Sequence, residues 1–230
     1  MYKKDAFKKL DAKYNTHLYT GLLGYAMRYC QRQLEKFDKK EKYSKVLEVG
    51  AGSEPHLKYL KHDYDEYFIA ETSDYALEFY KGIKNIKAYS YDGKKLPFND
   101  NFFDRIIISH CLEHVMEPEK FLFEMMSKLK KGGVLSISLP TDPGLLWRLG
   151  RLFIRCFIIK KTYNVSNAEY EYMNATEHIN SIFTLVNLIR YNFKNQIEEH
   201  YLPFRIKLLD INLFYIVHIT KFGNYVYSNK

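Results

Sequence analysis

The chain has 230 residues, a length that fits one ordinary domain or a domain with an elaboration. Hydrophobic residues make up 47% and charged residues 27%, a composition typical of soluble globular proteins that excludes wholesale disorder. Three widely spaced cysteines form neither a disulfide framework nor a zinc-binding spacing, so a reducing compartment is expected. We expect no signal peptide, no transmembrane helix and a cytoplasmic location, because the first residues are polar and no long apolar run follows.

The net charge of +8 is unevenly distributed. Residues 1–45 carry a net charge of +7 and residues 143–161 one of +5, whereas residues 46–142 carry −4. A basic face is typical of proteins that bind nucleic acid and of proteins that dock on anionic lipid. The alternative is a lysine-rich surface that only contacts water, so the charge alone leaves three interpretations open.

Hydrophobic patterning predicts alternating elements through the first two thirds of the chain. Leucine and tyrosine spacing predicts a helix over residues 17–37, which a charged connector follows at 39–45. Short apolar runs predict strands over 46–50, 66–70, 86–91, 104–109 and 134–139. Helices are predicted over 55–61, 74–81 and 118–130, the last ending at Gly132-Gly133. Strands that alternate with helices indicate a parallel sheet with helices on both faces.

The last third of the chain follows a different pattern. A helix is predicted over 182–193, and strands over 196–202 and 213–220 have no helix between them, which indicates an antiparallel hairpin at the sheet edge. Residues 141–181 are too long for a simple connection and are expected to cap the site. We therefore divide the chain into a basic helical segment (1–45), an α/β core (46–140), a helical cap (141–195) and the hairpin (196–230).

The predicted carboxyl ends of the strands carry the candidate binding residues, because open parallel sheets bind ligands there. The first strand runs into glycines at positions 50 and 52, which let the backbone approach a ligand closely. Pro55 stands where a dinucleotide fingerprint needs its third glycine, which disfavours a pyrophosphate site. Glu71 ends the second strand, 21 residues after Gly50, and could accept hydrogen bonds from a ribose diol. The alternative is a surface or helix-capping glutamate.

Two further strand ends complete this pattern. Asp92 follows the third strand and could accept a hydrogen bond from an adenine amine, while Ser109 and His110 end the fourth. Each position alone is ambiguous. Together they lie where one bound nucleoside would need them.

The segments VLEVGAG, IAETS and YDGKKLPFNDNFFDRIIISHCLEHVMEPEKFLFEMMSKLKKGGVLSISLP resemble class I S-adenosylmethionine-dependent methyltransferases of the small-molecule group. This resemblance covers about residues 44–140 and implies a doubly wound, seven-stranded, mostly parallel Rossmann-like sheet whose last strand is antiparallel. It implies S-adenosyl-L-methionine as cofactor and S-adenosyl-L-homocysteine as product. The cofactor-binding residues that it implies are Glu48, Gly50, Ala51, Gly52, Glu71, Thr72, Ser73, Asp92, Gly93, Ser109 and His110.

The resemblance has two departures. Glu54 stands where the family often has a third glycine, and Glu71 replaces the commoner aspartate, so we expect altered packing with binding retained. TDPGLLWRLGR (141–151) and YEYMNATEHIN (170–180) are similar to an uncharacterised subgroup of these enzymes, many of which accompany bacterial surface-polysaccharide or lipid biosynthesis.

Methyl transfer to a hydroxyl needs a general base, usually histidine. The candidates are His110, His114 and His178, of which His114 and His178 are our choice as catalytic residues; the alternative for each is a structural contact. His110 and His114, with Cys111 between them, could suggest zinc, but two histidines four positions apart without a third ligand in reach are a weak signal, so no metal is expected.

The segment 145–161 is predicted to be an amphipathic helix with Arg148, Arg151 and Arg155 on one face. These arginines could lie at the headgroups of an anionic membrane, in peripheral contact at its inner face. They could also clamp the phosphate of a substrate. The third interpretation is an exposed stripe on a cap helix.

The sequence therefore predicts a methyltransferase that modifies a small-molecule or lipid-linked acceptor, with O-methylation of a sugar or glycan precursor as the leading hypothesis. An RNA methyltransferase is the first alternative, but an NPPY-like motif is missing where residues 109–112 stand, and no nucleic-acid partner is expected. A non-catalytic cofactor-binding scaffold in glycan assembly is the second. It would be favoured if Glu71→Ala abolished function while His114→Ala and His178→Ala did not. The oligomeric state stays open.

Overall fold

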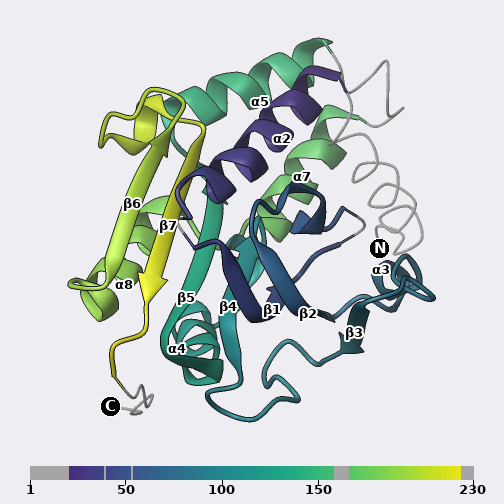
Figure 1. Cartoon of the computed structure of the whole chain (residues 1–230). Coiled ribbons are helices and arrows are strands. Elements are labelled where there is room, and N and C mark those ends of the chain that lie inside the picture. Colours follow the sequence, from purple (N-terminus) through teal and green to yellow (C-terminus); the bar gives the residue numbers. More distant parts are fainter. Residues whose placement is uncertain (1–20, 39, 53, 158–165, 224–230) are drawn as a thin grey trace.

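The computed structural model describes residues 21–38, 40–52, 54–157 and 166–223, which form a central twisted sheet between two layers of helices (Figure 1). The helices are α2 (Gly21–Lys36), α3 (Asp74–Glu78), α4 (Pro118–Lys128), α5 (Leu145–Phe157), α7 (Asn167–Glu177) and α8 (Ile182–Phe193). The strands are β1 (Lys42–Val49), β2 (Asp63–Glu71), β3 (Ile86–Ser90), β4 (Phe103–Ser109), β5 (Leu129–Pro140), β6 (Ile197–Leu202) and β7 (Phe214–Thr220). Three short 3-10 helices are η1 (His56–Tyr59), η2 (Leu112–His114) and η3 (Leu209–Ile211).

The seven strands lie in the order β3-β2-β1-β4-β5-β7-β6. Strands β1 to β5 run parallel to one another, and β7 runs antiparallel to both β5 and β6. This confirms the predicted seven-stranded, mostly parallel sheet with an antiparallel last strand. In the register, Val49 pairs with Ala70 on one side and with Ile108 on the other, so β1, β2 and β4 end side by side.

Each face of the sheet buries its own apolar cluster, because alternate residues of a strand point to opposite faces. On one face Leu47, Phe68 and Ile106 pack with the apolar sides of α4 and α8. On the other face Val46 and Ile69 pack with the apolar side of α2 and with Trp147 of α5. The two layers fix the ends of the strands on which the site is built.

A buried polar network lies between α2 and the sheet. The guanidinium of Arg105 on β4 is fully buried and forms ion pairs with Glu35 (2.7 Å) and Asp38 (3.0 Å) at the end of α2. Its Nε donates to Ser136 Oγ on β5 at 3.1 Å, and Glu35 also contacts His56 Nε2 at 2.7 Å. A buried charge needs such partners because its desolvation is costly. The network therefore ties α2 to the middle of the sheet.

The structure differs from the predicted elements at several boundaries. Strand β1 begins at Lys42, within the predicted connector, because that residue pairs in register with Asp63. The helix expected over 55–61 is only the single turn η1. Residues Gly132-Gly133 lie inside β5, where both hydrogen-bond to the backbone of Lys221, and so do not terminate α4. A side chain at position 133 would also meet the Asp104 carbonyl oxygen at 3.0 Å.

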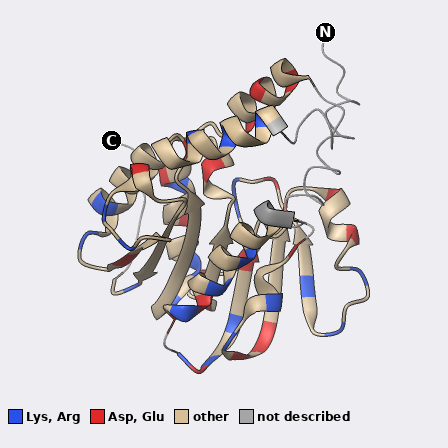
Figure 2. Cartoon of the chain, turned by 90° about the horizontal axis from the view of Figure 1, so that it is seen from above, with Lys and Arg blue, Asp and Glu red and all other residues tan. Residues whose placement is uncertain are grey.

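The charges of the described residues are dispersed. Figure 2 shows basic and acidic segments interspersed over the described elements instead of one continuous basic face. Within those residues we find no helix that has both the length and the apolar character needed to cross a bilayer. Residues 1–20 of the predicted basic segment 1–45 lie outside the described residues.

Candidate functional site

The turn after β1 forms a glycine cradle against the end of β2. Gly50 and Gly52 both have positive φ angles, +71° and +57°, which side chains rarely adopt. A Cβ on Gly50 would lie 2.5 Å from Cys111 Sγ, so the turn meets the loop after β4 only because that residue is glycine. A Cβ on Gly52 would instead face open space, with no atom within 4 Å. The space beside Gly52 would admit a ligand, whereas Gly50 is packed against the loop after β4.

Glu71 closes this cradle. Its Oε2 accepts a hydrogen bond from Gly52 N at 2.9 Å, while its Oε1 accepts from Thr72 N at 2.8 Å and Ser73 N at 3.1 Å. The carboxylate is 6% exposed and is held at the end of β2 by three backbone donors. Ser73 also caps α3, because its Oγ accepts from Ala76 N. Glu71 is thus preorganised as a hydrogen-bond acceptor at the predicted place.

Asp92 follows β3, the strand that pairs with β2 and so ends beside Glu71. It is exposed, and its Oδ1 accepts hydrogen bonds from Lys94 N at 2.9 Å and Lys95 N at 3.1 Å. These backbone hydrogen bonds, first that from Lys94, lower the pKa of Asp92. Gly93 follows with a φ of +78°, beside the Thr72 methyl group. An ionised acceptor at an accessible position suits the recognition of an amine.

These residues fit S-adenosylmethionine. The cofactor needs an acceptor for a ribose diol, an acceptor for an adenine amine, and a close backbone approach. Glu71, Asp92 and Gly52 would supply these in turn, and a side chain at position 52 would fill the open space beside the backbone. Ala51 is 9% exposed and lies between the two glycines of the cradle.

Glu48 lies beneath the cradle rather than in it. It is 2% exposed, and its carboxylate accepts from His56 N at 2.7 Å and from Tyr67 Oη at 2.6 Å. Burial raises its pKa to about 7, against the Tyr67 and His56 hydrogen bonds. We therefore assign Glu48 a supporting role under the turn, where the sequence resemblance implies a cofactor contact.

The loop after β4 brings Ser109 and His110 to the same edge. Ser109 Oγ hydrogen-bonds to Ser138 Oγ at 2.9 Å. His110 has a positive φ of +51°, an uncommon conformation that directs the next residue, Cys111, toward Gly50. Burial, together with nearby His178 and His114, lowers the pKa of His110 to about 3, so its imidazole is neutral. Among the described residues, its buried Nε2 has no hydrogen-bond partner.

His114 and His178, the two predicted catalytic residues, lie together although 64 positions separate them in the chain. Their ring centroids are 5.0 Å apart. His114 Nδ1 contacts the Glu177 carbonyl oxygen at 2.8 Å, and His178 Nδ1 contacts Asp142 Oδ2 at 2.8 Å. In each ring the Nδ1 proton thus has an acceptor, which leaves Nε2 as the basic nitrogen in the neutral form. Each histidine is oriented by a specific partner.

Asp142 organises this cluster from the end of β5. Both of its oxygens accept from Arg151 Nη1, at 3.0 and 2.9 Å, and one also meets His178. Burial disfavours its ionised form, but the His178 and Arg151 contacts outweigh burial and keep the pKa of Asp142 below its usual value. For His178, burial is likewise outweighed, by Asp142 and Glu113, so the pKa of His178 is raised above 6.5. The pair is an Asp–His dyad at the carboxyl edge of the sheet.

The segment Glu177–Asn180 connects the cap to the loop after β4. Asn180 N donates to the Glu113 carbonyl oxygen at 3.1 Å, and Asn180 Nδ2 donates to the Val115 carbonyl oxygen at 2.6 Å. Together with the contacts of His114 and His178, these bonds fix the EHIN segment across the site. Helix α7 and the segment Glu177–Asn180 therefore lie beside the candidate active site, whereas α8, which was expected in the cap, packs on the sheet with α4.

Two of the three arginines of α5 form ion pairs with acidic residues of the chain, where a phosphate or a lipid headgroup was expected. Arg151 is held by Asp142, and Arg155 Nη1 lies 3.2 Å from Glu171 Oε1 on α7. Both of these charges are thus balanced by acids within the chain, whereas Arg148 has an exposed side chain on the same helix. The three arginines do not form the shared phosphate clamp considered from their spacing.

Two groups of described residues could hold a metal ion on geometry alone. They are Glu113, His114 and His178 at the dyad, and Glu35, Asp38 and His62 in the network under α2. In the first group, His178 already contacts Asp142 Oδ2 through its Nδ1 at 2.8 Å. The second group already surrounds the Arg105 guanidinium. That the site works without a metal stays a prediction.

Sequence reasoning missed Glu113 and Asp142. Glu113 is 3% exposed, and burial raises its pKa. Its Oε1 lies 3.8 Å from His114 Nε2, and its Oε2 has no hydrogen-bond partner among the described residues. Both acids belong to motifs of the family resemblance, but nothing in the sequence indicates that residues 113, 142 and 178 meet.

Comparisons with known proteins show which family the core of the chain resembles. Residues 47–137 match the family model described as a methyltransferase domain. The demethylmenaquinone methyltransferase of Clavibacter sepedonicus is 34% identical over 97 residues, 40% of each chain. The ubiquinone/menaquinone biosynthesis C-methyltransferase UbiE of Vibrio cholerae is 41% identical over 55 residues, 24% of this chain and 21% of that protein. The matched region thus spans less than half the length of these relatives.

Solved structures resemble the whole fold. A possible histamine N-methyltransferase from Thermotoga maritima superposes with a TM-score of 0.63 at 17% identity, over 94% of this chain and 98% of that one. The plantazolicin methyltransferase BpumL, solved with S-adenosylhomocysteine, gives a TM-score of 0.62 at 15% identity, over 96% and 92% of the two chains. At such identities the likeness concerns the fold alone. The family model, the fold and the cradle together identify residues 47–137 as a methyltransferase domain of the class I, S-adenosylmethionine-dependent family.

Proposed function

We propose that this chain transfers the methyl group of S-adenosylmethionine to a hydroxyl of a small-molecule or lipid-linked acceptor, with a sugar or glycan precursor as the leading candidate. The observation that carries the proposal is the Asp142–His178 dyad, with Nδ1 and Oδ2 2.8 Å apart at the carboxyl edge that also bears the cradle. A hydroxyl is a poor nucleophile until its proton is removed, and an oriented histidine is suited to that step.

The roles follow from the contacts. When bound, S-adenosylmethionine supplies a methyl group on a sulfonium, and the attacking oxygen displaces the sulfur in line. His178 accepts the hydroxyl proton at Nε2, while Asp142 holds the ring through Nδ1 and stabilises the resulting imidazolium. Arg151 keeps Asp142 ionised and in position. His110, which is neutral, and Glu113, which is buried, lie beside His114 and His178 and add no positive charge to the imidazolium that forms on His178.

His114 serves to orient the acceptor in this proposal. Its Nδ1 contacts the Glu177 carbonyl oxygen, and its Nε2 lies 3.8 Å from Glu113 Oε1, beside the His178 ring. Such a group can hold the acceptor hydroxyl in line with the methyl group, and correct alignment supplies much of the acceleration in a displacement.

A second candidate is methylation of a ring carbon in a quinone. The names of the two curated relatives favour it, since both are quinone-biosynthesis methyltransferases. Their similarity covers at most 40% of this chain, and Asp142 and His178 lie beyond the matched family domain. The dyad therefore favours the hydroxyl acceptor, and product analysis separates the two.

The test uses the purified protein, methyl-labelled cofactor and a lysate of the source cells, which is then split into organic, aqueous and nucleic-acid fractions. Label in the organic or aqueous fraction, on an alkali-stable O-methyl ether by mass spectrometry, supports the proposal. Label on a ring carbon supports the quinone alternative, and label in the nucleic-acid fraction contradicts both. His178→Asn should lower labelling by about 100-fold or more, whereas His200→Asn, on β6, is the matched control.

A further inference from the structure

An exposed apolar surface runs along α5, on the side that faces away from the sheet. Leu145, Leu149 and Leu152 recur at helical spacing and are each between 45% and 52% exposed. The opposite side of the helix is anchored, since Trp147 packs against the sheet cluster and Arg151 is bound by Asp142. The helix is thus turned with its apolar face outward, which a soluble helix packed on a domain avoids.

The loop between β6 and β7 extends this surface. Residues 203–208 are all exposed and read Pro-Phe-Arg-Ile-Lys-Leu. Phe204, Ile206 and Leu208 are 49% to 58% exposed, and the cations Arg205 and Lys207 alternate with them. No acidic residue occurs in the loop. In residues 203–208, exposed apolar side chains therefore alternate with cationic side chains.

The loop is rigidly held although its side chains are exposed. Asn212 is fully buried, and its side chain accepts from Phe204 N at 3.1 Å and donates to the Ile206 and Leu208 carbonyl oxygens at 2.9 and 2.7 Å. The shape of the loop is thus fixed from beneath, and its backbone needs little further ordering when its apolar side chains bind a partner.

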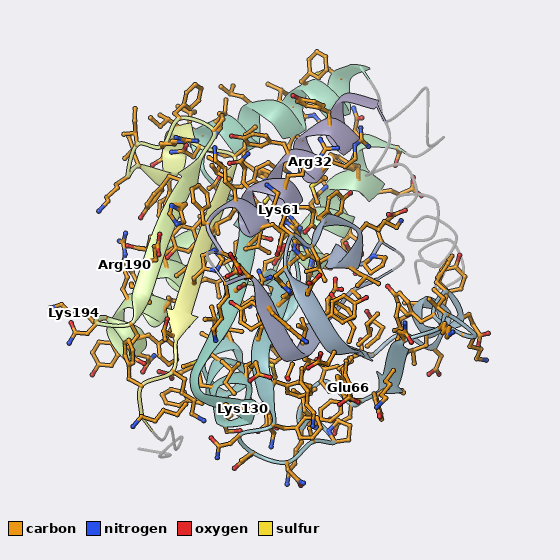
Figure 3. All side chains as sticks on the ribbon, viewed as in Figure 1. Arg32, Lys61, Glu66, Lys130, Arg190 and Lys194 are labelled. Carbon is orange, nitrogen blue, oxygen red and sulfur yellow. The ribbon has the colours of Figure 1, made fainter. Side chains whose placement is uncertain are left out.

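Helix α5 and the loop are neighbours in space. Leu145 N donates to Asp210 Oδ1 at 3.3 Å, and a Cβ on Gly144 would lie 3.1 Å from the Leu209 carbonyl oxygen. Figure 1 shows the β6–β7 connection beside one end of α5. In Figure 3, where the same view labels Glu66 and Lys130, those side chains lie on the lower side of the molecule, away from α5. The start of α5 and the end of the loop therefore adjoin each other.

We propose that the outward face of α5 and the loop 203–208 form a docking surface for an anionic lipid bilayer. The charge argues for this occupant, because the exposed cations Arg148, Arg205 and Lys207 accompany the apolar side chains. A bilayer offers anionic headgroups directly above an apolar interior, and a surface of this composition matches both. The structure changes the expectation for 145–161 in one respect: Arg151 and Arg155 pair with Asp142 and Glu171, so of the three arginines only Arg148 is left exposed beside the leucine face.

The surface also suits the proposed acceptor. Helix α5 leaves the sheet directly after Asp142, so the bilayer face and the dyad lie on two sides of one helix. A lipid-linked acceptor would reach His178 without leaving the membrane surface. Docking does not depend on this acceptor, and vesicle binding can succeed while the labelling of a lysate fails.

The test is cosedimentation of the full chain with vesicles of phosphatidylcholine containing a third phosphatidylglycerol, compared with pure phosphatidylcholine. We expect partition into the anionic vesicles that weakens at high salt. Arg205→Ser with Lys207→Ser should lower the partition coefficient about 25-fold, since each cation near an anionic surface contributes about fivefold. Leu149→Ser with Phe204→Ser should lower it about 30-fold, on the basis of half-burial of each side chain in lipid.

The matched control is Ile83→Ser with Tyr191→Ser, two exposed apolar residues on other sides of the molecule, at 46% and 82% exposure. Partition unchanged by this control supports the proposal. Protein that stays in the supernatant with anionic vesicles overturns it, and so does an equal loss in the control. A dimer that Leu149→Ser with Phe204→Ser disrupts, without any vesicle binding, would assign the surface to a second copy of the chain and overturn the proposal as well.

Discussion

Replacement of Glu71 by glutamine tests the cofactor cradle without any knowledge of the acceptor. Three backbone N–H groups, from Gly52, Thr72 and Ser73, converge on the carboxylate at 2.8 to 3.1 Å. A glutamine amide offers one acceptor oxygen and one donor nitrogen, so at least one of these N–H groups would face another donor. The substitution therefore removes the charge and misaligns the turn that carries Gly52.

The magnitude follows from the hydrogen bonds that glutamine cannot make to the cofactor. Hydrogen bonds to a charged group contribute about 1.5–3 kcal/mol each, and a ribose diol can donate two. Glutamine keeps one of them as a neutral acceptor, so we expect the affinity for S-adenosylhomocysteine to fall by roughly 100-fold, about 2.7 kcal/mol. Isothermal titration calorimetry of the purified protein measures this directly.

Two controls separate binding from folding. Glu66→Gln changes the same residue type on the same strand, where Glu66 forms ion pairs with the lysines Lys45 and Lys87 (Figure 3). It should leave the affinity unchanged. Thermal unfolding of Glu71→Gln without ligand reports any loss of fold. An affinity within about threefold of the original protein, with the fold intact, would refute the assignment of Glu71 to the cofactor.

Three further outcomes are expected. Asp142→Asn should lower kcat/KM by about 100-fold and shift the acidic limb of its pH profile to lower pH. Asp142 raises the pKa of His178 above 6.5, and the base acts only when it is neutral. An acidic limb that does not move would contradict the dyad. Dialysis against a strong chelator should leave the methylation rate unchanged, whereas a loss restored by one divalent cation would assign a metal to Glu113 and its histidine neighbours. Arg105→Met should lower the free energy of unfolding in urea by about 3–5 kcal/mol, because Glu35 would stay buried without its cation; addition of Glu35→Gln should recover part of this loss.

The sequence predicts those features that depend on local patterning. Helix α8 is expected over residues 182–193, and the structure has those bounds. The hairpin of β6 and β7 is predicted from two apolar runs without a helix between them, and it lies at the predicted edge of the sheet. The cradle is predictable because the ends of parallel strands meet at one edge, which converts positions in a sequence into neighbours in space.

Predicted boundaries fail where pairing with a distant strand overrides local signals. Gly132-Gly133 is a strong helix-stop signal, yet both residues hydrogen-bond to Lys221, whose position no local pattern shows. The buried network around Arg105 is missed for the same reason, since isolated charges along a sequence usually indicate a solvated surface. In both cases the decisive partner lies far away in the chain.

The candidate active site shows the same limit more sharply. His114 and His178 can be named because histidine is the usual base, but their partners Asp142 and Glu113 cannot, since only the folded cap brings them together. Helix α5 obeys the same rule. Its amphipathic pattern is visible in the sequence. The sequence does not show which side of the helix faces water, because that depends on the ion pair between Arg151 and Asp142. The Asp142–Arg151 ion pair and the packing of Trp147 together fix the rotation of the helix, which places Arg151 beside the dyad and the leucines on the outward side.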